Sequence, residues 1–199
     1  MGDRTPIEVI VYSCPPEKVN DVLEVFEEFG LIGDQPPGFA IYPNRHANLE
    51  LGRGYARSEI SAGSCEEIAA ALPAAAAWKV WEDPAYEHLG EVRLNHPDLG
   101  AFVADCDALG RPVFTSDEID RLVDRTDGDR VQLGHLTGRT WEMALEQLGA
   151  ANNGVVLQRD AAPSSAPLQA VALNQLAAGP SRWMPPDAPG QARSTAPDR

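Results

Sequence analysis

The segment DCDALG holds two aspartates in the alternating arrangement that begins a calcium-binding loop. Such a loop needs oxygen ligands at its first, third and fifth positions, a glycine at the sixth and a glutamate at the twelfth. With Asp105 first and Asp107 third, Leu109 falls at the fifth position and Ser116 at the twelfth. Neither residue supplies the required ligand. The segment therefore predicts a polar turn around Gly110, followed by a helix cap, and no calcium site.

Cys14, in YSCPPEK, lies where an apolar strand passes into a helix. Backbone N–H groups and the helix dipole at such a position lower the pKa of a thiol and favour the thiolate. Residues 7–29 resemble the first strand–helix turn of thioredoxin-like and glutaredoxin-like proteins. The second cysteine of their C-x-x-C pair is Glu17 here, so the resemblance implies a monothiol redox protein that uses Cys14. The competing interpretation is a small apolar cysteine that closes the strand.

The histidines do not form a metal-binding pattern. None of the four lies at ligand spacing from another histidine or from a cysteine; they are His46, His88, His96 and His135. The sequence therefore predicts no metal site and no cofactor. The glycine-rich and G-x-S-x-G motifs that would indicate nucleotide binding or a nucleophilic serine do not occur.

Aromatic residues gather in the segment WKVWEDPAYEHLG. On a strand, Trp78 and Trp81 point to opposite faces, so one enters the core while the other covers an edge or a partner. With Tyr86 they form the interaction patch that the sequence favours most, because aromatic anchors are enriched at interfaces. Packing of these rings inside the protein is the alternative.

Four carboxylates recur at helical spacing on one face of the first predicted helix: Glu17, Asp21, Glu24 and Glu28. A solvated helix face explains such a stripe in most proteins. Two functional interpretations remain beside it. The stripe either meets a protein partner that is basic, or it imitates nucleic acid phosphates and inhibits a DNA-binding protein.

The elements that position these residues follow from hydrophobic periodicity and turn signals. Residues 5–83 predict the order β-α-β-β-α-β, which is the ferredoxin-like split motif. Pro15 and Pro16 precede the first helix, Gly30 ends it, and Ser64 with Glu67 forms a capping box for the second. The expected elements are a strand at 7–13, a helix to residue 29, strands at 38–43 and 49–61, a helix from 64 to Pro73, and a strand at 77–83.

Residues 90–107 extend this core by a hairpin around the turn HPDLG, although a helix capped by Asp98 also fits the pattern. Two helices follow. The first begins with a capping box of Thr115 and Glu118, and its apolar residues form an inward stripe: Ile119, Leu122 and Val123. The second carries Trp141, Leu145 and Leu148 and stops at Gly149.

From residue 159 onward the composition shifts to proline, alanine, serine and glycine. Such a segment buries too little apolar surface to offset its chain entropy, so residues 159–199 are predicted to be a disordered tail. A short stretch at 168–184 has enough leucine and valine for a docking helix. Residues 1–158 are predicted to be a single α+β domain.

The 199 residues carry a net charge of −14, and three arginines against two aspartates in residues 161–199 leave −15 on the first 160. A field of this sign repels nucleic acid and anionic membranes. No apolar run approaches the roughly 20 residues that span a bilayer, the N-terminus lacks signal-peptide features, and three scattered cysteines do not form a disulfide framework. We therefore expect a cytoplasmic, acidic, non-enzymatic accessory protein that binds a protein partner.

Overall fold

The protein is described by a computed structural model in which residues 4–33, 46–85 and 89–159 are placed. These residues belong to one compact unit of the chain. Three predicted features lie outside the described residues, namely the strand at 38–43, Tyr86 and the tail from residue 160. No helix among the described residues is long and apolar enough to cross a membrane.

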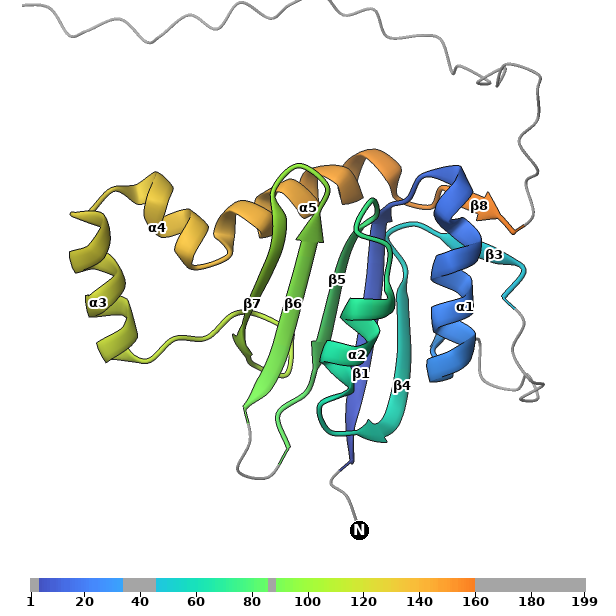
Figure 1. Ribbon diagram of the computed structural model, residues 1–199, viewed down its shortest axis with the longest axis horizontal. Helices are drawn as coiled ribbons and strands as arrows, with labels where there is room; N and C mark the ends of the chain where they lie inside the picture. The colour runs from blue at the N-terminus through green and yellow to red at the C-terminus, as the bar shows by residue number, and fades with distance from the viewer. Residues whose placement is uncertain (1–3, 34–45, 86–88, 160–199) are drawn as a thin grey trace, which may run out of the picture. The chain divides into compact units, whose positions relative to one another are not determined.

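The described residues form an α+β fold with five α-helices and an antiparallel sheet (Figure 1). The first half of the chain gives β1 (Arg4–Ser13), a 3₁₀ turn (Pro16–Lys18), α1 (Val19–Phe29), β2 (Ile32–Gly33), β3 (Asn48–Glu50), β4 (Gly54–Ser61), α2 (Ser64–Ala71) and β5 (Ala77–Glu82). The second half gives β6 (Gly90–His96), β7 (Gly100–Cys106), α3 (Ser116–Thr126), α4 (Arg130–Leu136), α5 (Arg139–Asn152) and β8 (Val156–Gln158).

Six strands form the main sheet in the order β2-β4-β1-β5-β6-β7, and every neighbouring pair is antiparallel. In the register of the central strands, Val9 of β1 is opposite Tyr55 of β4 on one side and Val80 of β5 on the other. A second, two-stranded sheet joins β3 to β8, so the last described strand returns to the middle of the chain.

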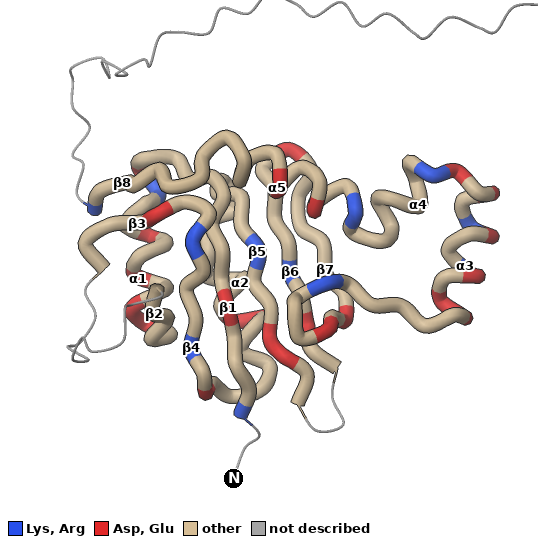
Figure 2. The backbone as a smooth tube through the Cα atoms, turned by 180° about the vertical axis from the view of Figure 1, so that it is seen from behind, with Lys and Arg blue, Asp and Glu red and all other residues tan. Residues whose placement is uncertain are grey.

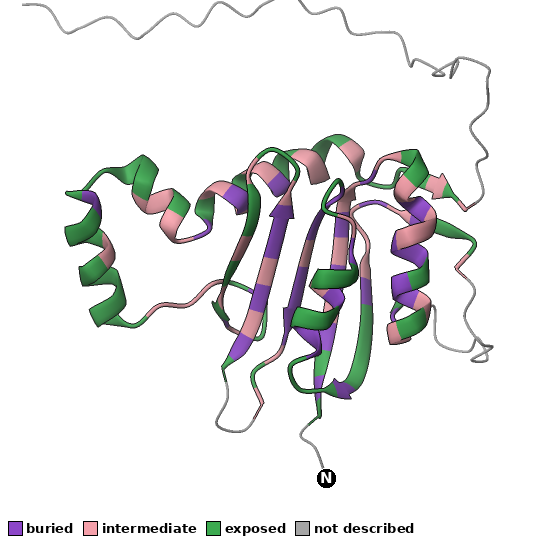
Figure 3. Ribbon diagram, in the orientation of Figure 1, coloured by how far each residue is buried: buried purple, intermediate pink, exposed green. Residues whose placement is uncertain are grey.

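Helices cover both faces of the main sheet (Figure 1). The α1 and α2 face holds the larger hydrophobic core, in which Val9 and Val11 pack with Phe26 and Ile68. The opposite face holds a smaller core beneath α5. Alternate residues of β1 enter the two cores, as the period of a strand requires. Residues of both alternations are therefore buried in the central strands, and Figure 3 shows β5 buried along most of its length.

Several local predictions are confirmed. Gly30 ends α1 with a left-handed φ of 64°, and α2 ends before Pro73. The hairpin of β6 and β7 forms, so the competing helix capped by Asp98 is wrong. The capping box of α3 is complete: the Thr115 hydroxyl accepts from the Glu118 N–H, and the Glu118 carboxylate accepts from the Thr115 N–H.

Two predictions for the first half of the chain need correction. Residues 49–61 are not one strand, because the chain turns at Gly52 with φ 77° and divides β3 from β4. Ser64 and Glu67 do not cap α2. The Ser64 hydroxyl donates to the Ser61 carbonyl, and the Glu82 carboxylate of β5 accepts from the first backbone N–H groups of the helix.

The second half differs more from expectation. Three helices follow the hairpin instead of two, since α4 was not predicted, and α5 continues to Asn152. The expected inward stripe of α3 is not buried, because α3 packs mainly on α4; Ile119 is 37% exposed and Val123 is 40% exposed. Figure 3 shows most of α3 exposed.

Candidate functional site

A groove of about 420 Å³ runs along the outer face of α1, opposite the end of α2 and the loop to β5. We call it the acidic groove. One wall carries most of its charge, and the other wall and the floor are small and apolar. Its lining residues are Lys18, Asp21, Glu24, Val25 and Glu28 on the first wall and Ala71, Pro73, Ala74 and Ala75 on the second.

The helical period of α1 explains why the carboxylates share this face. Val22 and Phe26 are fully buried against the sheet, and this directs Glu24 and Glu28, which are one turn apart, toward solvent. Asp21 joins them on the groove. The structure therefore brings three of the four predicted carboxylates together.

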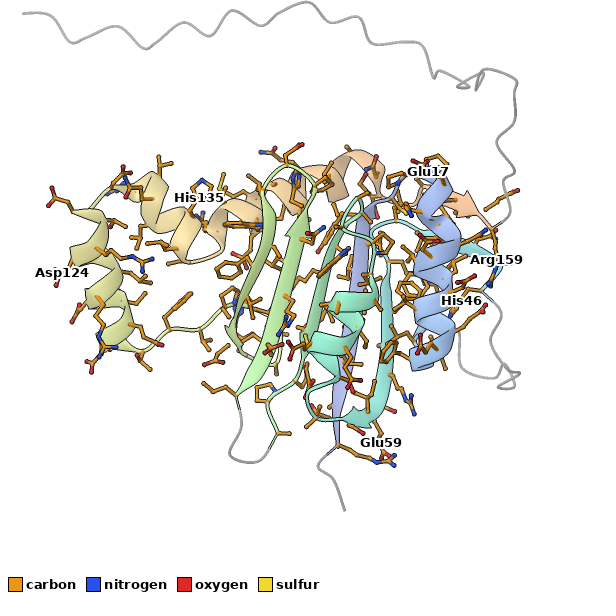
Figure 4. The ribbon with its side chains drawn as sticks, in the orientation of Figure 1. Glu17, His46, Glu59, Asp124, His135 and Arg159 are labelled. Carbon is orange, nitrogen blue, oxygen red and sulfur yellow. The ribbon has the colours of Figure 1, made fainter. Side chains whose placement is uncertain are left out.

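Glu17 is the exception. It lies in the 3₁₀ turn before α1, it is exposed, and it is not among the residues that line the acidic groove. Figure 4 shows Glu17 at the N-terminal end of α1. Glu17 precedes the regular helix, which begins only at Val19, so its place in the acidic face stays a prediction.

The charge of the acidic groove is partly compensated at one end. The Lys18 ammonium donates to Asp21 at 2.8 Å, and this hydrogen bond raises the pKa of Lys18. Within the part of the chain that the structure describes, no cation pairs with Glu24 or Glu28. The groove therefore keeps two uncompensated carboxylates beside an apolar floor. A cationic side chain with an aliphatic stem fits that combination.

The tryptophans do not form an exposed patch. Trp78 is 4% exposed in the core beneath α1 and α2, and Trp81 is 8% exposed in the core beneath α5. The prediction that one of them covers an edge or a partner is wrong, because β5 is a central strand with helices on both of its faces. Tyr86 lies outside the described residues.

Cys14 does not have the environment of a reactive thiol. It is 8% exposed, and burial, reinforced by the nearby Asp21 and Glu17 carboxylates, raises its pKa to about 12. The expected lowering of the pKa is wrong, because burial and the two nearby carboxylates act in the opposite direction. The regular helix also starts only at Val19, after a 3₁₀ turn. The other two cysteines are buried and free as well.

One aspartate of the candidate calcium loop, Asp107, is used by its own turn. The Asp107 carboxylate accepts from the backbone N–H groups of Leu109 and Arg111 and from the Arg111 guanidinium. These bonds lower the pKa of Asp107 to about 2, and Gly110 takes a positive φ of 66° as predicted. Among the described residues no three histidines, cysteines or carboxylates gather to hold a metal ion.

A second cavity, of about 730 Å³, was not predicted from the sequence. It lies between the turn that joins β6 to β7, α4, and α5 as far as Leu148, and it includes His96 and His135. These histidines are far apart in the sequence, so their spacing gives no signal. The clue within the sequence is the pair of arginines, Arg130 and Arg139, that flank the LGHLTG segment.

Comparison of the chain with protein-family models, with curated proteins and with solved structures gives no match.

Proposed function

We propose that the protein is a non-enzymatic binding module whose acidic groove takes a basic segment of a protein partner. The observation that carries this proposal is that two carboxylates stand beside an apolar floor. Glu24 and Glu28 have no cation partner among the described residues, and Val25 and small apolar residues form the floor. A lysine or arginine of the partner would lay its aliphatic stem on that floor and its charge beside the carboxylates.

The local structure supports a rigid site. The groove carboxylates stand on a helix whose other face is fully buried, so their backbone positions do not depend on a loop. The opposite wall follows α2, whose N-terminus is held by a carboxylate of β5. A preformed groove loses little conformational entropy when a partner binds.

We also infer that β1, β2, β4 and β5 with α1 and α2 form a ferredoxin-like unit. The support is the strand order β5-β1-β4-β2, all antiparallel, with α1 and α2 packed in the core on one face. In this arrangement β2 supplies the strand that the sequence suggests at residues 38–43. The helix layer of such a unit leaves the outer face of α1 open to a partner.

Affinity capture from the native host with the full chain tests the proposal. Glu24→Lys/Glu28→Lys reverses two charges one turn apart on the acidic groove. Asp120→Lys/Asp124→Lys is the matched control, since these exposed aspartates have the same spacing on α3 and the same change in net charge. The α1 variant is expected to lose the captured partner, which high salt also releases from the unmodified protein.

Retention of the same partner by the α1 variant, with loss in the α3 variant, would reject the acidic groove. Adding duplex DNA to the captured complex separates a second outcome. If DNA displaces the protein from a DNA-binding partner, the acidic face acts as a phosphate mimic, as the sequence also suggested.

A further inference from the structure

The cavity of about 730 Å³ beside α5 lies on the opposite face of the sheet from the acidic groove. Three segments line it: the turn that joins β6 to β7, α4, and α5 from Arg139 to Leu148. Its volume falls within the range of about 300–1,000 Å³ that is typical of small-molecule sites. Gly134 and Ala144, on facing helices, have no bulk to fill it.

The body of this cavity is apolar and incompletely covered. Leu99 and Leu148 contribute side chains that also pack against the core beneath α5. Val131 and Met143 line it as well, yet they are 71% and 49% exposed. Water against these side chains is unfavourable, so an apolar ligand that displaces it gains free energy in proportion to the area covered.

The charges at the cavity have the opposite sign to the protein as a whole. Arg130 opens α4 and Arg139 opens α5, and Figure 2 shows basic positions at the start of both helices. Neither guanidinium has an ion pair or hydrogen bond with any residue that the structure describes. Asp98 is the one carboxylate in the lining, and its side chain is 90% exposed.

These two arginines differ from several others in the fold. Arg93, Arg111 and Arg159 each bind a carboxylate directly. Within the described ranges, the two arginines at the cavity have no such carboxylate partner and remain available to a ligand. A guanidinium presents a fork of donors that matches a carboxylate in a two-pronged arrangement.

Two histidines also line the cavity, as do the polar residues Thr140 and Gln147. The Asp98 backbone N–H donates to Nδ1 of His96 at 3.2 Å, which leaves the proton of a neutral ring on Nε2 as a donor. His135 stands edge-on to Trp141, with ring centroids 5.5 Å apart, and this contact fixes its orientation. Figure 4 shows His135 at the junction of α4 and α5.

We propose that this cavity binds a small amphipathic anion, a monocarboxylate with an alkyl or aromatic body. The carboxylate pairs with Arg130 and Arg139, and the body covers Val131, Met143 and Leu99. An apolar cavity with a few convergent polar groups is the common form of a small-molecule site. The site shares no lining residue with the acidic groove, so either proposal can fail without the other.

Isothermal titration calorimetry on the full chain tests the proposal with three probes of equal chain length. Dodecanoate and dodecylammonium are kept below their critical micelle concentrations, and dodecanol is kept below its solubility limit. Dodecanoate is expected to bind about five- to ten-fold more tightly than dodecanol, because it adds ion pairs with two arginines that are exposed. Dodecylammonium is expected to bind more weakly than dodecanol, since two arginines repel it.

Variants assign the binding to this cavity. Arg130→Gln/Arg139→Gln is expected to abolish the preference for dodecanoate while dodecanol still binds. Arg121→Gln/Arg125→Gln in α3 is the matched control, because it removes the same charge from residues outside the lining. Met143→Ser is expected to weaken dodecanoate and dodecanol alike. Circular dichroism melts confirm that each variant is folded.

Equal affinity for dodecanoate and dodecanol in the unmodified protein would overturn the proposal. An undiminished preference for dodecanoate in the Arg130/Arg139 variant would do the same. If none of the three probes binds and the cavity instead takes an acidic protein segment, the small-molecule assignment is rejected.

Discussion

Both terminal nitrogens of the Arg159 guanidinium donate hydrogen bonds to the Glu27 carboxylate of α1, although the two residues are 132 positions apart in the chain. The same guanidinium donates to the His46 carbonyl, and the Arg159 N–H donates to the Ala47 carbonyl at 3.0 Å. Figure 4 shows Arg159 and His46 beside α1. This contact holds the chain immediately after β8 against the helix that carries the acidic groove.

Arg159→Ala is expected to lower the free energy of unfolding by roughly 1.5 to 3 kcal/mol, because a partly buried carboxylate loses charge-assisted bonds. Arg4→Ala is the matched control. Its partner Glu59 is 3.5 Å away and both side chains are largely exposed, so the loss should stay below about 1 kcal/mol. Urea denaturation at neutral pH compares them, and equal losses would show that the Glu27 contact is worth no more than a surface pair.

The same contact predicts a pH dependence. Arg159 lowers the pKa of Glu27 below its ordinary value of 4.5, so folding favours the ionised carboxylate. This contribution is complete above pH 4.5 and is lost as the pH falls through the lowered pKa of the folded protein. The free energy of unfolding, measured by urea denaturation at several pH values between 6 and 3, should fall less steeply with decreasing pH in Arg159→Ala than in the unmodified chain. Parallel curves would contradict the assignment.

Glu82 of the neighbouring strand β5 caps the N-terminus of α2. Its buried carboxylate accepts from the Gly63 N–H at 3.0 Å and from the Cys65 N–H at 3.2 Å. Glu82→Ala leaves the buried Cys65 N–H and the exposed Gly63 N–H without this acceptor and is expected to cost roughly 1 to 3 kcal/mol in a urea titration. Glu82→Gln keeps one acceptor oxygen and should cost less.

Glu67→Ala serves as the control for this cap, because Glu67 is the exposed partner in the capping box that the sequence suggested. The structure gives it no capping bond, so the change should stay within about 0.5 kcal/mol, as for other surface positions. A larger loss in Glu67→Ala than in Glu82→Ala would restore the sequence-based cap.

Gly110 packs against the face of Trp81. A Cβ at this position would lie 2.6 Å from Cγ of the indole, and φ is 66°. Gly110→Ala therefore combines backbone strain with a clash against a buried ring, and we expect a loss of roughly 2 to 4 kcal/mol.

Gly154→Ala separates the two causes, because Gly154 has a similar φ of 76° and open space around its Cβ position. It should cost only about 1 to 2 kcal/mol. Thermal melts with tryptophan fluorescence follow both variants. If the two losses are equal, the contact with Trp81 contributes nothing beyond the strained backbone.

Signals that act within a few residues were predictable from the sequence. The hydrophobic period of α1, Gly30 at its end, the capping box of α3 and the hairpin at residues 96–100 depend on neighbours in the chain. The carboxylate face of α1 follows from the same period, and this is why Asp21, Glu24 and Glu28 were found together.

Relationships between distant segments were not predictable. No residue near Arg159 in the sequence indicates that it pairs with Glu27. The strand β8 is only three residues long, so the sequence around it gives no sign that it pairs with β3. The apolar wall of the acidic groove depends on where α2 packs. Trp81 was misjudged because its burial requires the core beneath α5, which the alternation of one strand does not reveal. The cavity beside α5 was missed for the same reason, because its lining comes from three separate segments of the chain.

All three cysteines are buried and free, and this should make their thiols unreactive. Burial raises the pKa of Cys14 and of Cys106 to about 12, and it raises that of Cys65 too. Since alkylation requires the thiolate, iodoacetamide at pH 8 should modify the native protein far more slowly than the urea-unfolded chain. Mass spectrometry of the alkylated cysteines makes the comparison residue by residue.

The raised pKa values of the buried thiols also make the free energy of unfolding depend on pH in the alkaline range. Below their ordinary pKa of 9.0 the thiols are protonated in both states, and between pH 9 and about 12 the unfolded chain ionises first, so stability falls as the pH rises. Cys14→Ala should flatten this fall, measured by urea denaturation with a reductant present. Rapid, stoichiometric alkylation of native Cys14 at pH 7 would contradict the buried thiol and return the monothiol redox hypothesis to consideration.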